Sequence, residues 1–341
     1  MEKNFASTEF SILNNNQKRN KIIVTGASGF IGSNLVLELC KMTNCHIVGI
    51  DWCEKTNKAL LEDTGSLVLN ESRSSAGNFI LIEDDYSSDK CLDYIKNDKD
   101  ITHIVHLAAI PRVAYSVENP AKTCFENEVK MVKLLETIRG SSVRFIFAGS
   151  SSIYGNTNKF PTLESDVKNP QSPYAIQKLS GELYMQNCNM THSLDCVALR
   201  FFNVFGPRQL GDSPYSCVVS AWCNAIKLGK NLRLDGDGLQ ERDFCYIDNT
   251  VDAIIKCINS NKKFNGNSYN VACNEYNSLL PILEYFKERF GDKILIDYAP
   301  PRLGDVRKTH ADISSISNDL GYSPTVNFWE GLRRTIEWWK I

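Results

Sequence analysis

The chain has 341 residues, of which 43% are hydrophobic and 23% charged, and its formal net charge is −2 at pH 7. This balance provides no basic surface for nucleic acid or an anionic membrane, so neither is expected as a partner. The length suits a doubly wound domain and a smaller lobe that share one cleft. Twelve cysteines are scattered without a C-x-x-C pair or a metal-ligand spacing, so we expect reduced thiols, no metal site and a cytoplasmic protein.

The N-terminal part begins with a polar extension, residues 1–20, which lacks the apolar core of a signal peptide. No apolar run in the chain has the length that a membrane span requires. Some helical patterning appears over residues 58–69, within a polar stretch rich in serine and asparagine.

A glycine-rich turn, T-G-A-S-G-F-I-G, lies between an expected strand at residues 22–24 and an expected helix at residues 33–39. Gly26 permits the tight turn, Gly29 leaves room for a pyrophosphate, and Gly32 lets the helix pack close to the strand. Free N–H groups at the start of that helix favour an anion. The turn predicts a dinucleotide site, although a glycine turn without a ligand has the same local pattern.

Acidic residues follow the next two expected strands. Residues 46–50 end in Asp51, 25 residues after Gly26, where a carboxylate meets an adenosine ribose in dinucleotide-binding folds. Its negative charge favours NAD over NADP, because it repels a 2′-phosphate. The third strand, residues 79–82, leads to Asp85, which either meets the adenine amino group or belongs to solvated acids that cap the next helix.

The next elements are a fourth strand over residues 101–109, a long helix over residues 121–139 and a fifth strand over residues 143–148. The small residues that end the fourth strand suit a backbone lying against a cofactor. His103 and His106 are expected to be structural, because no acid or cysteine partners them at a useful spacing.

Hydroxyl groups gather where the fifth strand ends, in the segment G-S-S-S-I-Y-G at residues 149–155. This is the sheet edge where ligands bind in such folds, although serines also satisfy local backbone groups. A helix then opens at residues 172–180, with Pro173 in its first turn. Tyr174 and Lys178 share one face of that helix, where a lysine ammonium lowers the pKa of a tyrosine toward that of a usable base.

Together these motifs resemble an extended short-chain dehydrogenase/reductase, and within it the NAD-dependent nucleotide-sugar 4-epimerases, from Lys21 to the end of the chain. The segments that carry the resemblance are residues 25–32, 106–109, 150–155, 174–178, 200–207 and 236–244. The resemblance implies a Rossmann-type NAD domain over residues 21–203. It also implies a smaller mixed α/β lobe for the nucleotide-sugar over residues 204–341, with a segment near 240–272 returning to the first domain.

The resemblance assigns roles to individual residues. It implies that Tyr174 is the acid/base, that Lys178 supports it and anchors a ribose, and that Ser150 hydrogen-bonds the reacting C4 oxygen. The implied NAD contacts are Gly26, Gly29, Phe30, Ile31, Gly32, Asp51, Asp85, Tyr86, Leu107, Ala108, Ala109, Tyr174 and Lys178. The implied contacts to a UDP-sugar are Ser150, Ser151, Ser152, Asn203, Arg242, Arg302, Asp305 and Thr309.

Among the substrate contacts, the family uses Asn203 and Arg242 for the diphosphate, and Arg302 with Asp305 to clamp the nucleotide. Arginine suits a diphosphate because its planar fork donates two hydrogen bonds. The alternative for Arg242 is a surface ion pair with the neighbouring Asp243.

The chain departs from the family pattern after the fourth strand. Where the family has Asn-Val-x-Gly-Thr, this chain has Glu-Val-Lys-Met-Val at residues 128–132. The neighbouring Asn127 is the candidate replacement for the cofactor-side polar contact.

Thr309, seven residues after Arg302, occupies the family's gate on the sugar pocket, where a bulky aromatic residue excludes N-acetyl groups. A threonine there predicts UDP-N-acetylglucosamine and UDP-N-acetylgalactosamine as substrates, with UDP-glucose and UDP-galactose also possible. The alternatives are a UDP-uronate 4-epimerase or decarboxylase, a non-catalytic NAD-binding scaffold, and a 4,6-dehydratase. The dehydratase is disfavoured because Ser151 and Ser152 replace its acidic pair.

In this family, helices equivalent to residues 121–139 and 174–190 pair with their copies in a four-helix homodimer interface. The apolar and neighbouring residues on these helices fit either that interface or the monomer core. They are Val129, Val132, Leu135, Ile138, Leu179, Leu183 and Gln186.

Overall fold

The computed structural model describes residues 20–42, 44–52, 78–212, 216–291, 294–301 and 306–341. The helical patterning at residues 58–69 and the predicted site residues Arg302 and Asp305 lie outside these ranges. Among the described residues, no helix is both long and apolar enough to cross a membrane.

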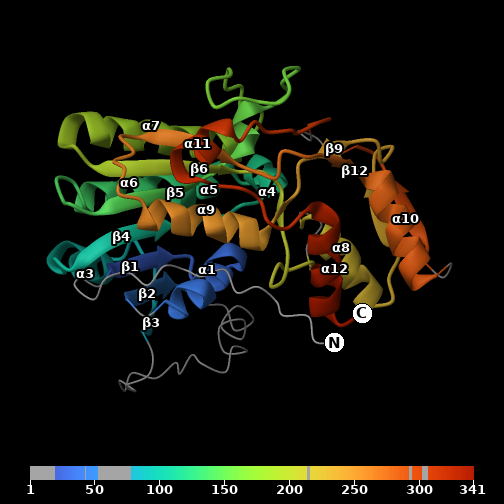
Figure 1. The fold of residues 1–341 in the computed structure, drawn as a ribbon, viewed down its shortest axis with the longest axis horizontal. Coiled ribbons are helices and arrows are strands. Elements are labelled where there is room, and N and C mark those ends of the chain that lie inside the picture. The colour runs from blue at the N-terminus through green and yellow to red at the C-terminus, as the bar shows by residue number, and fades with distance from the viewer. Residues whose placement is uncertain (1–19, 43, 53–77, 213–215, 292–293, 302–305) are drawn as a thin grey trace, which may run out of the picture.

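The centre of the molecule is a parallel sheet, in which the described residues form seven strands in the order β11-β6-β5-β4-β1-β2-β3 (Figure 1). Their bounds are β1 Asn20–Thr25, β2 Cys45–Asp51, β3 Phe79–Glu83, β4 Ile101–His106, β5 Arg144–Ser150, β6 Asp195–Phe201 and β11 Asn267–Val271. The strand order reverses direction at β1, so the connections leaving β1 and β4 diverge and open a crevice at their carboxyl ends. The predicted doubly wound, Rossmann-type fold is confirmed.

Helices cover both faces of this sheet. On one side α1 (Phe30–Cys40) contacts α9 (Ile247–Asn259), and on the other α6 (Lys130–Thr137) contacts both α3 (Asp89–Asn97) and α7 (Pro173–His192). The buried side chains divide in the same way, since alternate residues of a strand point to opposite faces. Ile22 and Val24 join the core under α1 and α9, whereas Ile23 joins the core under the other three helices.

The prediction of one continuous α-helix over residues 121–139 is wrong for residues 125–129, which form a π-helical turn. The segment consists of α5 (Pro120–Cys124), a π-helical turn (Phe125–Val129) and α6, and it follows the short α4 (Val113–Glu118). A π-turn widens the helix locally without changing the surrounding apolar pattern, so sequence periodicity does not reveal it.

A smaller lobe lies beside the carboxyl ends of the strands, on the right of Figure 1. Its elements are α8 (Val218–Lys227), β8 (Leu232–Asp235), β9 (Glu241–Arg242), β12 (Asn277–Ser278), α10 (Leu279–Phe290), β13 (Ile296–Ala299) and α12 (Phe328–Trp339). Strands β8 and β13 pair in parallel, and β9 pairs with β12. Trp222 on α8 packs edge-to-face against Phe286 on α10, with ring centres 5.5 Å apart.

Short elements connect the lobe to the sheet. Strand β7 (Val204–Phe205), which follows β6, pairs with β10 (Cys245–Tyr246), which leads directly into α9. Helix α11 (Ser314–Leu320) contacts β11 at the edge of the sheet. The chain therefore leaves the sheet after β6 and returns to it through β10, α9 and β11.

Candidate active site

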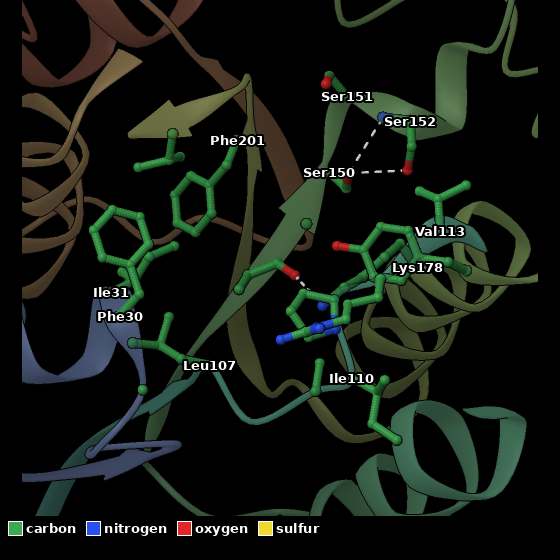
Figure 2. Close-up of a pocket in the computed structure, with 18 of the residues that line it drawn as sticks. Phe30, Ile31, Leu107, Ile110, Val113, Ser150, Ser151, Ser152, Lys178 and Phe201 are labelled. Carbon is green, nitrogen blue, oxygen red and sulfur yellow. Dashed lines mark hydrogen bonds between the residues drawn. The ribbon is translucent and has the colours of Figure 1, made fainter. Parts of the chain in front are cut away.

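A cavity of about 800 Å³ lies at the carboxyl ends of the parallel strands. Its lining comes from the β1–α1 turn, from the ends of β2 to β6, and from segments of the smaller lobe. In Figure 2, Phe30, Ile31 and Leu107 lie on one side and the serines at the end of β5, Ser150 to Ser152, on the other, with Lys178 between them. This is the position where open α/β sheets bind their ligands.

The β1–α1 turn fits a dinucleotide because its backbone approaches neighbouring backbone too closely for side chains. A Cβ at Gly32 would lie 2.0 Å from the Gly26 carbonyl oxygen. Gly26 itself has a φ of +72°, and a Cβ there would lie 2.8 Å from the Ala108 nitrogen. The N-cap of α1, Gly29, provides no side-chain hydrogen bond to the first helical N–H groups, which leaves them for an anion such as a pyrophosphate.

The carboxylate at the end of β2 is fixed from the glycine turn. Asp51 accepts hydrogen bonds from the Ser28 N–H at 2.9 Å and from the Ser28 hydroxyl at 2.5 Å, and it lines the cavity. These bonds orient it at the edge where a ribose is expected.

At the end of β3, the two neighbouring carboxylates of Asp84 and Asp85 make different contacts. Asp84 accepts from the Ser88 hydroxyl at 3.1 Å, next to the start of α3, whereas Asp85 bonds the Lys130 ammonium at 2.5 Å. Burial raises the pKa of Asp85, but the bonds from Lys130 and Ser87 outweigh it and hold that pKa below its usual value. Asp85 therefore carries a negative charge at the cavity wall, beside Tyr86, which also lines it.

The loop after β4 forms the cavity wall at Leu107, Ala108 and Ala109. Asn127, from the π-turn, holds this loop by accepting from the Ile110 N–H at 2.7 Å and donating to the Ile110 carbonyl at 3.1 Å. Asn127 is 5% exposed, and its amide also donates to Gln177 at 2.9 Å. The residue suggested as a cofactor contact thus positions the loop that lines the cavity.

The two histidines of β4 are buried in the sheet. The His106 Nδ1 lies 2.7 Å from the Thr25 hydroxyl, and burial lowers the pKa of His106 to about 3. Burial likewise lowers the pKa of His103 to about 4. Both rings are therefore neutral and structural, as expected from the sequence. The described residues contain no group of three or more acids, histidines and cysteines arranged to hold a metal.

The Tyr174–Lys178 pair is positioned by the start of α7. Ser172 caps this helix by accepting from the Ala175 N–H at 3.2 Å, and the Tyr174 N–H donates to Ser116 at 3.1 Å. The Lys178 ammonium donates to the Ala148 carbonyl at 2.7 Å and lies 5.7 Å from the centre of the Tyr174 ring.

Ser150 lies where β5 ends, within reach of the same tyrosine. Its Oγ accepts from the Ser152 N–H at 3.2 Å and lies 2.9 Å from the Ser152 hydroxyl (Figure 2). Ser151 and Ser152 line the cavity beside it. Both interpretations of this cluster therefore apply, since Ser150 completes a local turn and also faces the cavity.

Burial dominates the acid–base behaviour of the pair. It raises the pKa of Tyr174 to about 12, against the lowering effect of a hydrogen bond with Ser150. It lowers the pKa of Lys178 to about 8. At neutral pH the lysine is thus mostly an ammonium and the tyrosine a phenol, and an additional positive charge near the ring would favour the phenolate.

Asn203, Arg242 and Thr309 lie together on the lobe side of the cavity. The Asn203 amide donates to the Asp243 carbonyl at 3.0 Å and to the Thr309 hydroxyl at 2.9 Å, so its N–H groups are engaged within the protein. Arg242 is 8% exposed and donates to the carbonyls of Glu241 and Arg307 at 2.9 and 3.3 Å. A surface ion pair between Arg242 and Asp243 is excluded, because both residues are buried.

Sequence reasoning missed several residues that line the same cavity: Trp52, Arg112, Lys130, Phe160, Arg208, Gln209 and Lys308. Of these, Lys130 stood out in the sequence, because it lies in the segment that departs from the family pattern. The others come from loops, where no periodicity points to a pocket.

The doubly wound sheet, the glycine turn and the Tyr174–Lys178 pair beside a serine-lined strand end define an extended short-chain dehydrogenase/reductase. The sequence profile described as the NAD dependent epimerase/dehydratase family matches residues 22–272, and the chain belongs to this family. The predictions of an NAD-dependent nucleotide-sugar 4-epimerase and of NAD as its cofactor are confirmed.

Individual relatives differ in their sugar. The UDP-glucose 4-epimerase of Mycolicibacterium smegmatis is 31% identical, over 94% of this chain and 98% of its own. The UDP-N-acetylglucosamine 4-epimerase of Methanobrevibacter ruminantium, solved with UDP-N-acetylmuramic acid, is 32% identical with a TM-score of 0.84, covering 95% of this chain and 99% of its own. The UDP-glucuronic acid 4-epimerase of Bacillus cereus, solved with UDP-glucuronic acid and NAD, is 31% identical with a TM-score of 0.83, covering 94% and 99%.

Proposed function

We propose that this enzyme inverts C4 of UDP-N-acetylglucosamine and UDP-N-acetylgalactosamine, and that UDP-glucose and UDP-galactose are secondary substrates. The observation that carries the sugar assignment is Thr309, a small side chain lining the cavity beside Asn203 and Arg242. Its hydroxyl accepts hydrogen bonds from the Asn203 amide and the Asp243 N–H, at 2.9 and 3.0 Å, so the methyl group and the small volume remain to shape the pocket.

In the proposed reaction Tyr174, as phenolate, takes the proton from the sugar 4-hydroxyl while Ser150 donates a hydrogen bond to the C4 oxygen. Bound NAD would supply reversible hydride transfer at C4, and the β1–α1 glycine turn and Asp51 would hold it. The Lys178 ammonium stabilises the phenolate, and Arg242 neutralises part of the diphosphate charge. Because Tyr174 returns the same proton to the C4 oxygen, the reaction leaves no net proton change in the active site.

UDP-glucuronate is the second candidate, because an enzyme that acts on it is among the similar structures. A uronate carboxylate requires an available cation or several donors. Lys308, next to Thr309, pairs with Glu241 at 2.7 Å and lies 3.6 Å from the centre of the Tyr276 ring, so its charge is already partly neutralised. This pairing favours a neutral sugar.

The test is to incubate the purified protein, without added NAD, with UDP-N-acetylglucosamine, UDP-glucose and UDP-glucuronate in separate samples, and to follow C4 inversion by proton NMR. We expect inversion of the acetylated sugar at the highest rate and of UDP-glucose more slowly. Faster inversion of the uronate than of either neutral sugar would contradict the sugar assignment. No inversion of any of the three, even after NAD is added, would contradict the catalytic assignment.

Replacing Thr309 with tyrosine tests the gate. We expect Thr309→Tyr to lower kcat/KM for UDP-N-acetylglucosamine about 10- to 100-fold, because the aromatic ring fills space needed by the acetyl group, and to affect UDP-glucose much less. Thr309→Ser keeps the hydroxyl that Asn203 and Asp243 use, and serves as the control. If both sugars respond equally to Thr309→Tyr, the residue supports the pocket without selecting the sugar.

The proposed organisation includes an NAD domain over residues 21–203, a sugar lobe over residues 204–341 and a homodimer in the cytoplasm. Apolar side chains exposed on α7 and on the π-turn support the dimer, among them Phe125 (48%), Val129 (40%) and Leu183 (56%). Phe125 was not among the predicted interface residues, whereas Val129 and Leu183 were; two others that were predicted, Leu135 and Ile138, are buried in the monomer core.

Light scattering at micromolar concentration tests the dimer. We expect twice the monomer mass for the native chain and a shift toward monomer for Leu183→Glu, because a charge is costly in a buried apolar interface. Asn318→Glu places the same charge at an exposed polar position on α11, outside the two proposed interface helices, and serves as the control. A monomer mass for the native chain would rule out the homodimer at that concentration.

A further inference from the structure

A buried ion pair lies one helical turn from Lys178, outside the lining of the cavity. Glu182 on α7 is 2% exposed, and Arg200 on β6 is 3% exposed. The Arg200 guanidinium donates to the two Glu182 carboxylate oxygens at 2.7 and 3.0 Å, and the Ser268 hydroxyl donates to one of them at 3.2 Å. Such a pair is weak evidence for stability, because desolvation of the two charges offsets most of their attraction.

The Glu182 carboxylate acts on Lys178 through its charge. Burial lowers the pKa of Lys178 to about 8, and the negative charge of Glu182 opposes this by raising it. The Lys178 ammonium also lies near the Tyr174 ring on the same helix and near His106 on β4, which is neutral because burial lowers its pKa to about 3. Of these neighbours, Glu182 is therefore the group that favours the charged lysine.

Other charged and titratable groups next to this part of α7 are engaged with partners of their own. They are Arg200 on β6, which pairs with Glu182, Tyr154 after β5, which bonds Arg200, and Glu128 on the π-turn, which accepts from the Ser180 hydroxyl at 2.5 Å.

The guanidinium connects the same pair to the serines at the end of β5. Arg200 donates to the Tyr154 hydroxyl at 2.7 Å, and that hydroxyl donates to the Asn270 side-chain carbonyl at 2.7 Å. Tyr154 is buried and ends the short 3-10 turn Ser151–Tyr154, which directly follows Ser150. Arg200 thus fixes the far end of the turn that carries the cavity hydroxyls.

The carboxylate also packs against the backbone of β5 next to these serines. A Cβ at Gly149 would lie 3.2 Å from the Glu182 Oε1 and 3.1 Å from the Leu199 carbonyl oxygen. Gly149 is paired with Arg200 across β5 and β6, and it directly precedes Ser150. The helix that carries Tyr174 and Lys178 and the strand end that carries Ser150 therefore meet at one ion pair.

We propose that the Glu182–Arg200 pair positions the catalytic groups of the epimerase. Its carboxylate keeps Lys178 an ammonium, and its guanidinium, through Tyr154, holds the serine turn against α7. The inference rests on the roles proposed for Tyr174 and Lys178, and it explains how a buried lysine keeps the charge that a phenolate needs.

The first test is the pH dependence of kcat at saturating UDP-sugar. Glu182→Gln removes the charge and keeps the shape, so we expect the loss of kcat at high pH to begin about one pH unit lower. The variant should then be about tenfold slower than the native enzyme on the alkaline side and approach it on the acid side. Glu182→Asp, which keeps the charge, should restore the native profile.

The matched control breaks the ion pair at the opposite ends of the same two strands. Asp195→Asn removes the partner of Arg144, at 2.8 Å, and should lower stability without moving the pH profile. An unchanged profile in Glu182→Gln would overturn the proposal. If Glu182→Gln does not fold because Arg200 is left unpaired, the double variant Glu182→Gln/Arg200→Gln leaves no unpaired charge and should show the same shift.

A second measurement needs no turnover. It is the free energy of unfolding of the NAD-free protein in urea, relative to the same chain with Lys178→Met, over a range of pH. Because the pKa of Lys178 falls from 10.5 to about 8 on folding, this difference rises with pH from about pH 8, and without Glu182 it should rise from about pH 7. The same onset in both chains would overturn the role of Glu182. A shifted onset in a protein that inverts no sugar would support that role and contradict the proposed function alone.

Tyr154→Phe tests the connection to the serine turn. It removes the hydroxyl that Arg200 and Asn270 share, so we expect kcat to fall about tenfold with KM and the midpoint of the pH profile unchanged. Tyr269→Phe removes the hydroxyl of another buried tyrosine, which bonds Asp319 at 2.6 Å, and should leave kcat unchanged. A native kcat in Tyr154→Phe would overturn the part assigned to Arg200.

Discussion

Burial changes the acid–base behaviour of individual residues more than sequence spacing indicates. The four-residue spacing of Tyr174 and Lys178 puts both side chains on one helix face, but burial raises the pKa of Tyr174 to about 12 and lowers that of Lys178 to about 8. The Lys178 ammonium donates to the Ala148 carbonyl, and the group that lowers the pKa of Tyr174 against burial is Ser150, through a hydrogen bond.

Replacing Tyr174 with phenylalanine removes only the hydroxyl and keeps the ring. We expect at least a roughly 100-fold loss of C4 inversion, which is the lower end of what general acid–base catalysis contributes, with bound NAD unchanged. Proton NMR measures the turnover, and absorbance of the denatured protein's supernatant measures the NAD. Tyr184→Phe, on the exposed side of the same helix, is the control. Near-normal turnover in Tyr174→Phe would show that another residue is the base.

The lowered pKa of Lys178 makes stability depend on pH. Between about pH 8 and 10.5 the folded NAD-free protein binds fewer protons at this residue than the unfolded chain, so the free energy of unfolding rises with pH. Above about pH 10 the raised pKa of Tyr174 acts in the opposite direction, because the unfolded tyrosine loses its proton there and the folded one keeps it, so the window that isolates Lys178 is about pH 8–10. Relative to Lys178→Met, the native chain should gain about 2 kcal/mol across this window, measured by urea unfolding. If the difference in free energy of unfolding between the native chain and Lys178→Met stays constant across about pH 8–10, the pKa of Lys178 is not lowered.

At the scale of elements, the π-turn between α5 and α6 determines the shape of the cofactor side of the cavity. The turn carries Asn127, whose side chain holds the Ile110 backbone after β4, and it adjoins Lys130, which holds Asp85 after β3. One helical irregularity therefore fixes the ends of two strands. Such turns are frequent at functional sites.

Asn127→Ala should destabilise the protein by about 2–4 kcal/mol, because it leaves the Ile110 N–H and carbonyl without their side-chain partner. We also expect weaker NAD binding, since the loop at Leu107 to Ala109 loses its support. Urea unfolding and the NAD exchange rate measure the two effects. Asn187→Ala, at an exposed position of α7, should change neither. A stable variant with normal NAD retention would contradict the positioning role.

At the scale of the whole molecule, one buried carboxylate joins the sheet to the smaller lobe. Asp243, which is 0% exposed, lies between β9 and β10. It accepts from the Cys273 N–H at 3.0 Å, just after β11, and from the Ala311 N–H at 3.1 Å. The Asp243 N–H donates to the Thr309 hydroxyl, which lines the cavity. The sugar side of the site therefore depends on the contacts by which Asp243 joins the sheet to the smaller lobe.

Asp243→Asn should lower the free energy of unfolding by about 2–4 kcal/mol, because the amide turns a donor toward backbone N–H groups that need an acceptor. The effect should extend to the sugar site, with a higher KM for the UDP-sugar and an unchanged NAD exchange rate. Asp248→Asn, an exposed acid in the first turn of α9, is the control. Equal stability of the two variants would show that Asp243 does not join the two parts.

The sequence by itself determined the features that depend on neighbouring residues: the glycine turn, the strand and helix periods, the hydroxyls after β5 and the Tyr174–Lys178 spacing. From these followed the doubly wound fold and the NAD cofactor, whereas the epimerase class followed from the resemblance of the motifs to the nucleotide-sugar 4-epimerases. The residues predicted around the site, apart from Arg302 and Asp305 outside the described ranges, line one cavity.

Only the tertiary structure decided how these residues are paired. The bond between Lys130 and Asp85, the support of Ile110 by Asn127, and the contact between Asn203 and Thr309 join residues 45, 17 and 106 positions apart. Local periodicity reports which side of an element is buried, but it carries no information on which distant side chain meets it there. For this reason the class of enzyme could be predicted from the sequence, whereas the arrangement that holds the cofactor and shapes the sugar pocket could not.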